Sequence, residues 1–246
     1  MRITIKHIIA FSTLILASVF SVSAQTKTYD VSSFNKITIN PHIQVTFIKG
    51  DKASVVIESS TESLDKLNVE VDDETLELYL DDARVYTKSE KNNNIRKDVY
   101  NGTVVKATIT YTTISALSLR GEERFDFVDN VEAKDLKLSV YGDSQVYMKE
   151  IEVENLKIST YGESYLMIES GTTNYQQIRA YGESKLNAIN VDNKETKLTA
   201  YGEGTFQLNV SDKLKVTSYG EAVVTYKGNA KLSRGLSFGD ATVRKL

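Results

Sequence analysis

A short motif, Tyr-Gly-Glu-Ser or a close variant of it, recurs seven times between residues 120 and 241. The glycines of successive copies are separated by 21, 20, 20, 20, 18 and 19 residues. A period near 20 residues is typical of a solenoid, in which each repeat forms one rung and buries its apolar face by stacking on its neighbours. The seven glycines, for which we predict a structural role, are Gly121, Gly142, Gly162, Gly182, Gly202, Gly220 and Gly239.

Apolar and polar residues alternate on both sides of each glycine, which predicts strands with one buried face. An apolar residue stands three positions before and five positions after the residue that precedes the glycine. These positions differ by an even number, so an uninterrupted strand places them on one inward face. They are Leu138, Ile158, Ile178, Leu198 and Val216 before the glycine, and Val146, Leu166, Leu186, Phe206 and Val224 after it.

The same parity places the glycine itself inward, together with the small residue two positions later, so that backbones can approach closely or bend there. It places the residue before the glycine and the acidic residue after it outward. We therefore expect an aromatic column of Tyr141, Tyr161, Tyr181, Tyr201, Tyr219 and Phe238. Beside it we expect an acidic column of Glu122, Asp143, Glu163, Glu183, Glu203, Glu221 and Asp240. Together the two columns are called the stripe below.

Residues 1–24 have the layout of a secretory signal peptide. Arg2 and Lys6 precede an apolar run from Ile8 to Phe20, and Val22-Ser23-Ala24 forms a small-residue cleavage site. The run is shorter than the roughly 20 residues that span a bilayer core, which favours a cleaved signal over a membrane anchor. We expect export to the periplasm, the outer membrane or the exterior, without a transmembrane span after cleavage.

Composition excludes several classes of protein. The chain has no cysteine, so disulfides, a thiol nucleophile and cysteine-bound zinc are absent. Removing residues 1–24 changes the formal net charge from −3 to −5, and no polybasic block disturbs that balance, which disfavours a nucleic-acid partner. We expect residues 25–246 to form a single domain, with irregular rungs over 25–115 and regular repeats over 116–246. The polar stretch from Asp81 to Thr103 predicts a long loop or insertion.

The N-terminal half carries its own signature. It contains the strings Phe34-Asn-Lys-Ile-Thr-Ile, Ile43-Gln-Val-Thr-Phe, Gly50-Asp51, Ser54-Val55-Val56-Ile57 and Thr75-Leu76-Glu-Leu78. Together with the later glycine turns, this pattern resembles the head GIN domain family of Bacteroidota, whose members are described as auto-transporter adhesins and also catalogued as a domain of unknown function. The resemblance covers most of the mature chain. It implies a right-handed parallel β-helix and an adhesin-like role.

The family uses Ser-Gly-Ser-Gly-like turns, whereas here tyrosine precedes the glycine and an acid follows it. Both departures fall on outward positions. They leave the core pattern intact and set the surface apart from that of other members.

Catalytic chemistry finds little support in the sequence. His42 is the single histidine of the mature chain, and we expect a surface or packing role for it. No nucleophile-elbow motif accompanies it. A polysaccharide-acting enzyme would need carboxylates clustered in one groove, whereas the acids here recur once per rung. We therefore expect no enzyme.

The acidic column has two interpretations. Carboxylates about 5 Å apart repel by roughly 1 kcal/mol in water, so the column is either a solvated ladder or a site that attracts cations. Calcium requires six to eight oxygen ligands, and one carboxylate per rung supplies too few. The Gly-Gly-x-Gly-x-Asp repeat of calcium-binding rolls is also missing. We expect no cofactor and keep calcium between rungs as the alternative.

The aromatic column is either a structural ladder, in which adjacent rings stabilise each other by roughly 0.2–1 kcal/mol per pair, or a contact surface. Lys137, Lys157, Lys197 and Lys215 border it. Our first hypothesis is a secreted or envelope binding protein that contacts an extended glycan or protein through the stripe. Its predicted ligand-binding residues are Tyr141, Tyr161, Tyr181, Tyr201, Tyr219, Glu163, Glu183 and Glu203. The alternative is an assembly module that forms oligomers through the ends of the β-helix.

Overall fold

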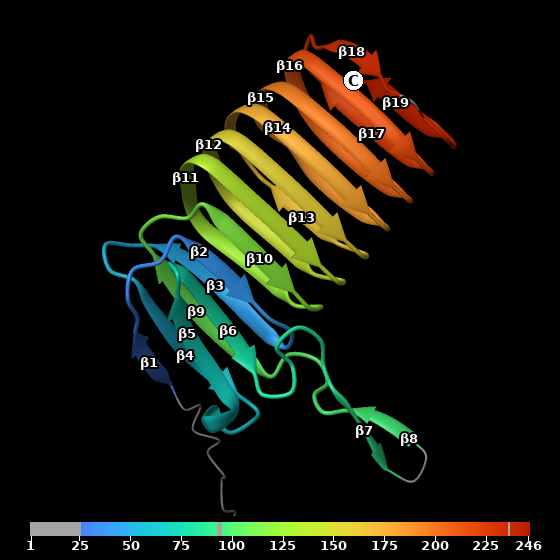
Figure 1. Cartoon of the computed structure of the whole chain (residues 1–246). Coiled ribbons are helices and arrows are strands. Elements are labelled where there is room, and N and C mark those ends of the chain that lie inside the picture. Colours follow the sequence, from blue (N-terminus) through green and yellow to red (C-terminus); the bar gives the residue numbers. More distant parts are fainter. Residues whose placement is uncertain (1–25, 93–94, 236) are drawn as a thin grey trace, which may run out of the picture.

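The computed structural model describes residues 26–92, 95–235 and 237–246, which form a β-solenoid of about six turns with about 20 residues per turn. The rungs stack along one axis from the blue N-terminal end to the red C-terminal end (Figure 1). Among these residues there is no α-helix, and the one helical turn is the 3-10 element η1 (Leu64–Lys66). The predicted β-helix is thus confirmed. The predicted signal segment, residues 1–24, lies outside the described residues.

Each regular rung has two strand arms joined by a turn at the repeated glycine. In one rung, residues 155–161 form the first arm, residues 162–164 the turn, and β13 (Tyr165–Ile168) the second arm. Equivalent residues of successive rungs lie opposite one another in parallel pairing, as Tyr141 and Tyr161 do. The near-constant period causes this register, because each rung returns every position to the same place.

Several strands of the regular half bend from the second arm of one rung into the first arm of the next. The strands of this half are β10 (Ala116–Arg120), β11 (Arg124–Tyr141), β12 (Gln145–Tyr161), β13, β14 (Gly171–Tyr181), β15 (Ser184–Tyr201), β16 (Gly204–Tyr219), β17 (Ala222–Lys227), β18 (Lys231–Arg234) and β19 (Ala241–Lys245).

The N-terminal rungs follow a different chain order. β2 (Lys36–Ile39) and β3 (Ile43–Lys49) form the rung that pairs with β10 and β11. β6 (Thr75–Leu80) and β9 (Val105–Tyr111) form the next rung outward. The segment between β6 and β9 stands where other rungs have their turn, and within it β7 (Ser89–Asn92) and β8 (Ile95–Asp98) form a hairpin that projects from the solenoid (Figure 1). The predicted insertion therefore lies beside the glycine turns.

Antiparallel strands close the N-terminal end. β4 (Ser54–Ser60) pairs antiparallel with β1 (Lys27–Asp30) and β9, and β5 (Leu67–Asp72) pairs antiparallel with β6. The turn between β5 and β6 has positive φ at Asp73 (44°) and Glu74 (58°), as in a type I′ hairpin. These strands depart from the parallel pairing of the regular rungs, because a tight hairpin reverses the chain whereas parallel pairing needs a longer crossover.

One continuous apolar core fills the solenoid. All ten inward positions predicted for the regular half are at most 2% exposed, and so are the alternating apolar residues of β2 and β3. Burying an aliphatic side chain of this kind contributes about 1.5–3 kcal/mol relative to leaving it exposed. The alternation in the sequence therefore determines which side of each strand faces inward.

Candidate functional site

The aromatic column lies on the outside of the solenoid, as strand parity predicted. Neighbouring tyrosine rings have centroids 4.8–4.9 Å apart and planes within 6° of parallel. Tyr161 is 38% exposed and Tyr201 is 40% exposed. Because each ring covers the face of the next, the column presents ring edges and hydroxyl groups to a partner and leaves few ring faces free. It ends at Phe238, whose ring centroid lies 5.9 Å from that of Tyr219.

The repeated glycines form turns, and the prediction that they point inward is wrong. Gly142, Gly162 and Gly182 are exposed and have φ of +82°, +109° and +100°. A Cβ atom on Gly182 would lie 2.9 Å from the carbonyl oxygen of Gly162, and Gly202 repeats this contact with Gly182. Parity fails at these residues because the chain changes direction. The predicted close approach of backbones is nevertheless present, so glycine is required for both its conformation and its size.

The small residue after the acid lies inward as predicted. The Ser144 hydroxyl donates to the carbonyl oxygen of Gly121 at 2.9 Å, and the Ser164 hydroxyl donates to that of Gly142 at 3.1 Å. Each bond connects one turn to the turn of the preceding rung. The motif therefore combines a stacked ring, a turn-forming glycine, an outward acid and an inward hydroxyl that secures the stack.

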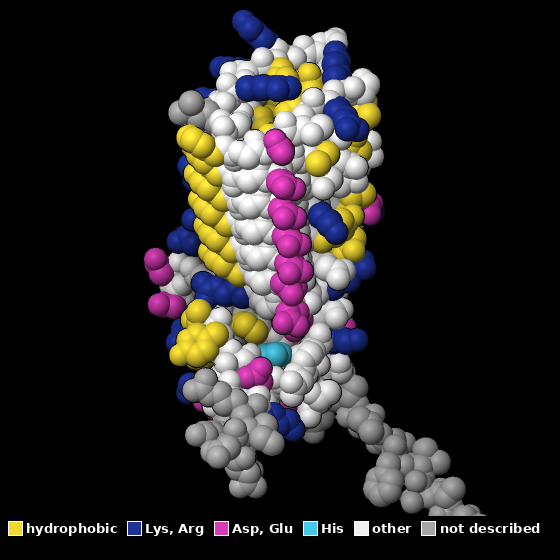
Figure 2. All heavy atoms as spheres, turned by 90° about the vertical axis from the view of Figure 1, so that its right-hand side faces the viewer, with side chains coloured by type: hydrophobic (Ala, Val, Ile, Leu, Met, Phe, Trp, Pro, Cys, Tyr) yellow, Lys and Arg dark blue, Asp and Glu magenta, His cyan; other side chains and the backbone are white. Residues whose placement is uncertain are grey.

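The acidic column runs parallel to the aromatic column, and a white strip without charged or hydrophobic side chains separates the two (Figure 2). All seven acids are exposed. None of them takes part in an ion pair within the described part of the chain. The column is thus a line of uncompensated negative charge, in which neighbours about 5 Å apart repel by roughly 1 kcal/mol at the dielectric constant of water.

Lysines border the aromatic column on its other side. Lys137, Lys157, Lys197 and Lys215 occupy one position of the first arm, four residues before the tyrosine, and all are exposed. The arm between Lys157 and Lys197 has Gln177 at this position, and its cation is Arg179, two residues closer to the tyrosine. The stripe therefore has a cationic margin on one side and an anionic margin on the other.

An arginine replaces tyrosine at the N-terminal end of the column. The guanidinium carbon of Arg120 lies 5.3 Å from the centroid of the Tyr141 ring, and its Nη1 donates to Oδ1 of buried Asn40 at 3.4 Å. The Asn40 amide in turn donates to Glu77 at 2.9 Å. The guanidinium of Arg84, 2.7 Å from Glu77, holds the pKa of that carboxyl below its usual range. Arg120 thus belongs to a hydrogen-bond network with Asn40 and Glu77, on the side of the turn where Tyr141 lies.

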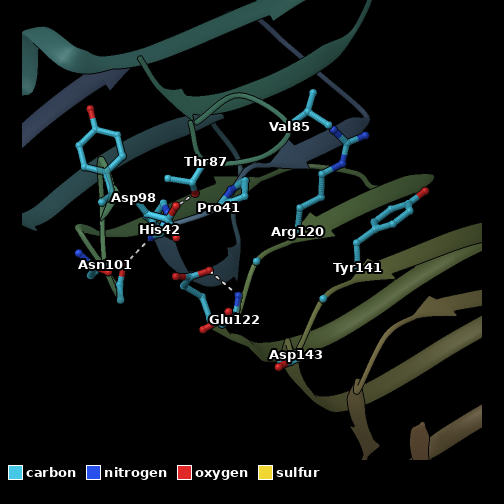
Figure 3. A pocket seen from close by; sticks show the side chains of 15 residues that line it. Pro41, His42, Val85, Thr87, Asp98, Asn101, Arg120, Glu122, Tyr141 and Asp143 are labelled. Atoms are coloured by element: carbon cyan, nitrogen blue, oxygen red, sulfur yellow. Dashed lines mark hydrogen bonds between the residues drawn. The ribbon is translucent and has the colours of Figure 1, made fainter. Parts of the chain in front are cut away.

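A pocket of about 490 Å³ opens where the insertion meets this end of the stripe (Figure 3). It is lined by the turn at residues 41–42, by insertion residues between 85 and 102, and by the first two glycine turns of the regular half. Sequence reasoning missed the pocket. The available signal was the first motif copy, which has Arg120 in place of tyrosine and Glu123 in place of serine.

His42 fastens the insertion to the solenoid. Its Nδ1 donates to the carbonyl oxygen of Gly102 at 2.7 Å, and its Nε2 lies 2.6 Å from the Thr87 hydroxyl. Its ring also packs at 5.6 Å, centroid to centroid, against that of Tyr100. Both ring nitrogens are therefore engaged with the two sides of the insertion, which fits the predicted packing role.

Glu123 is the unusual residue of the pocket wall. It is 3% exposed, and its Oε2 accepts a hydrogen bond from the backbone N–H of Glu122 at 2.9 Å. It forms no ion pair with any described residue. Burial raises the pKa of the Glu123 carboxyl, because a charge removed from water is penalised.

Among the residues that the structure describes, no three histidine, aspartate or glutamate side chains are grouped so that they could hold a metal ion. No helix in that part of the chain is long and apolar enough to cross a membrane.

Solved structures share the fold. A "putative adhesin" from Bacteroides fragilis NCTC 9343 superposes with a TM-score of 0.78 at 22% identity, over 92% of this chain and 98% of that one. A "putative adhesin" from Parabacteroides merdae ATCC 43184 gives 0.68 at 15% identity, over 92% and 97%. A "putative lipid binding protein" from Parabacteroides distasonis ATCC 8503 gives 0.63 at 17% identity, over 92% and 98%.

No curated protein matches the chain. The family model described as "Putative auto-transporter adhesin, head GIN domain" matches residues 33–230, which include the N-terminal signature and nearly all of the glycine turns. The chain therefore belongs to the head GIN domain family.

Proposed function

We propose that this protein is a non-catalytic, adhesin-like binding protein of the cell envelope or exterior that contacts an extended partner through the stripe. The observation that carries the proposal is the exposed tyrosine stack, with its rings 4.8–4.9 Å apart and an unpaired acidic column beside it. The name of the family supports an adhesive role. Export by the predicted signal segment would bring the stripe to the envelope.

The geometry suits a repetitive or extended partner. Each rung offers the same ring edge, hydroxyl and carboxylate, so weak contacts recur at the rung spacing of about 4.8 Å and linked contacts multiply in effect. Ring faces are covered within the stack. A glycan or protein would therefore be held mainly by hydrogen bonds to hydroxyls and carboxylates, and by packing against ring edges.

The test uses the triple variant Tyr161→Ser, Tyr181→Ser and Tyr201→Ser. Serine resembles the residue that the family uses before the glycine, so the fold should persist. The matched control makes the same change at Tyr147 and Tyr165, as Tyr147→Ser and Tyr165→Ser. These tyrosines are half-buried on the other arm, with ring centroids 5.5 Å apart. Wild type and variants are applied to a glycan array and to immobilised collagen, fibronectin and laminin.

We expect the triple variant to lose more than about tenfold in affinity for whichever probe the wild type binds, because truncating an interface tyrosine that is a hot spot costs about 2 kcal/mol. The control should retain binding. Equal binding by wild type and triple variant would show that the stack is only structural.

A second function, assembly through the solenoid ends, is favoured by one observation. At the C-terminal end β18 pairs only with β16, and β19 only with β17, among the described residues. These strands leave one edge free, and a free edge is a template for pairing with another chain. Lys231, Arg234, Arg244 and Lys245 line this last rung and would oppose pairing of two identical edges. Light scattering at low and high salt would detect such assembly.

A further inference from the structure

The pocket at the N-terminal end of the stripe has an excess of negative groups. Four carboxyl groups line it, those of Asp98, Glu122, Glu123 and Asp143, against the single guanidinium of Arg120. In Figure 3 the Arg120 side chain extends toward Val85, while Glu122 and Asp143 lie on the other side of the turn. Arg120 forms no ion pair with a described acid and contacts Asn40 and Tyr141 instead. The pocket therefore retains unneutralised negative charge.

Glu123 is not required by the fold. Equivalent positions of later turns hold Ser144, Ser164 and Ser184, all of them buried and uncharged. A buried carboxylate without a cation is costly, because its lost hydration is not replaced by a counter-charge. A buried acid in the wall of a pocket, whose pKa is raised by that burial, marks a candidate functional position. A cation bound in the pocket would supply the missing partner.

The shape of the pocket favours an organic cation over a metal ion. Within the described residues no three acidic or histidine side chains converge closely enough to chelate a metal. The carboxyl groups are instead distributed around a space of about 490 Å³. The rings of Tyr100 and Tyr141 also line it, and aromatic rings attract ammonium and guanidinium groups.

We propose that this pocket binds a ligand through a primary ammonium group, which is held by Glu123 with Glu122 and Asp143 beside it. The ammonium belongs either to a small amine such as an amino sugar or to a lysine side chain of a partner protein. This site meets the end of the stripe at Glu122, Tyr141 and Asp143. Its main residue, Glu123, lies outside the stripe.

The experiment follows backbone amide shifts by NMR during titration of the full mature protein with two matched pairs of probes. Glucosamine is compared with N-acetylglucosamine, and the peptide Gly-Lys-Gly amide with its ε-acetylated form, so that each pair differs in one positive charge. The variants are Glu123→Gln, which keeps an oxygen for the Glu122 N–H, and Glu123→Ser, which copies the later turns. Glu195→Gln is the control, because Glu195 is an exposed acid that lies outside the stripe and far from the pocket.

We expect saturable shifts around residues 121–123 and 142–143 with at least one charged probe and none with its acetylated form. Glu123→Gln and Glu123→Ser should weaken binding by about tenfold or more, which corresponds to about 1.4 kcal/mol, while Glu195→Gln leaves it unchanged. Binding of glucosamine identifies a small amine as the ligand class, and binding of the peptide alone identifies a lysine side chain.

Four results would each overturn the proposal. These are the absence of saturable binding by both charged probes, equal binding of the acetylated forms, wild-type affinity in both Glu123 variants, and an equal loss in Glu195→Gln. The triple tyrosine variant keeps the pocket intact. Failure of this site and failure of the stripe are therefore separately visible.

Discussion

Replacing Gly182 with valine tests how the turns are built. Gly182 has φ of +100°, a conformation that residues with a side chain rarely adopt. A Cβ atom there would lie 2.9 Å from the carbonyl oxygen of Gly162 and 3.3 Å from both its carbonyl carbon and its Cα. All three atoms belong to backbone that is bonded into the next rung, so none can move aside as a flexible side chain would.

The magnitude follows from two costs. Holding a residue in a sparsely populated region of φ and ψ costs about 1–3 kcal/mol, and forcing extra volume into a close-packed place typically costs about 1–3 kcal/mol more. We therefore expect the free energy of unfolding to fall by about 2–6 kcal/mol. For a chain of this length each kcal/mol lowers Tm by about 2–4 °C, so Tm should fall by roughly 4–24 °C.

Thermal unfolding followed by circular dichroism measures this change. The matched control is Glu183→Val, which adds the same branched side chain at the next, exposed position of the same turn, where φ is not positive. Its Tm should stay close to that of the wild type. The reasoning is refuted if Gly182→Val melts within a degree or two of the wild type, or if the control loses as much.

Three further predictions concern individual side chains. Burial raises the pKa of Glu123 above its unfolded value of about 4.3, so the contribution of this carboxyl to stability is fully present below about pH 4.3 and is lost as pH rises through the folded pKa. Glu123→Gln should therefore raise Tm near pH 7 but not near pH 3.5. An equal change of Tm at both pH values would contradict this. His42→Ala removes both hydrogen bonds to the insertion, so hydrogen exchange and proteolysis should increase within residues 83–104. The regular rungs should stay protected. Unchanged exchange within the insertion would exclude the anchoring role of His42. Ser164→Ala removes the bond to the Gly142 carbonyl and should cost about 0.5–1.5 kcal/mol in chemical unfolding, whereas no loss would mean that the hydroxyl does not secure the stack.

The repeat period and the alternation were sufficient to predict the regular half of the fold. Ile158 and Leu166 both point into the core although a turn separates their arms, and each is 1% exposed. Parity went wrong at Gly162 because it assumes an extended chain, and a residue at φ of +109° redirects the backbone. The parity prediction is correct again for the residues that follow, since Ser164 is buried and Glu163 is exposed.

The N-terminal half was harder to predict because its pairings are distant in the sequence. Lys36 pairs with Ala116, and β6 reaches β9 only after the long insertion. No period marks such pairings. The hairpin signal at Asp73-Glu74 was also weak, since type I′ turns favour Asn-Gly or Asp-Gly.

The candidate site likewise has one part that the sequence predicted and one part that it did not. Both columns of the stripe could be predicted, because each repeats one residue type at one position of every rung. The pocket could not, because it forms only when the turn at His42, the insertion and the turn at Gly121 come together in space. The sequence signal for the pocket was that Arg120 and Glu123 stand where later copies of the motif have tyrosine and serine. Such a difference does not by itself show which other segments pack against these residues.

Repetition and departure from repetition therefore serve different purposes in this molecule. Identical tyrosines and acids on successive rungs suit a partner that repeats or extends, since no single rung need bind tightly when several are engaged at once. A pocket formed once, at the end of the same columns, suits a single chemical group. Glu123 costs stability where serine would serve the fold, and a stability cost at one position of an otherwise regular array is expected where binding is selected. The two proposals thus assign the recurring surface to contact area and the single pocket to selectivity, and the tyrosine and Glu123 variants separate these roles.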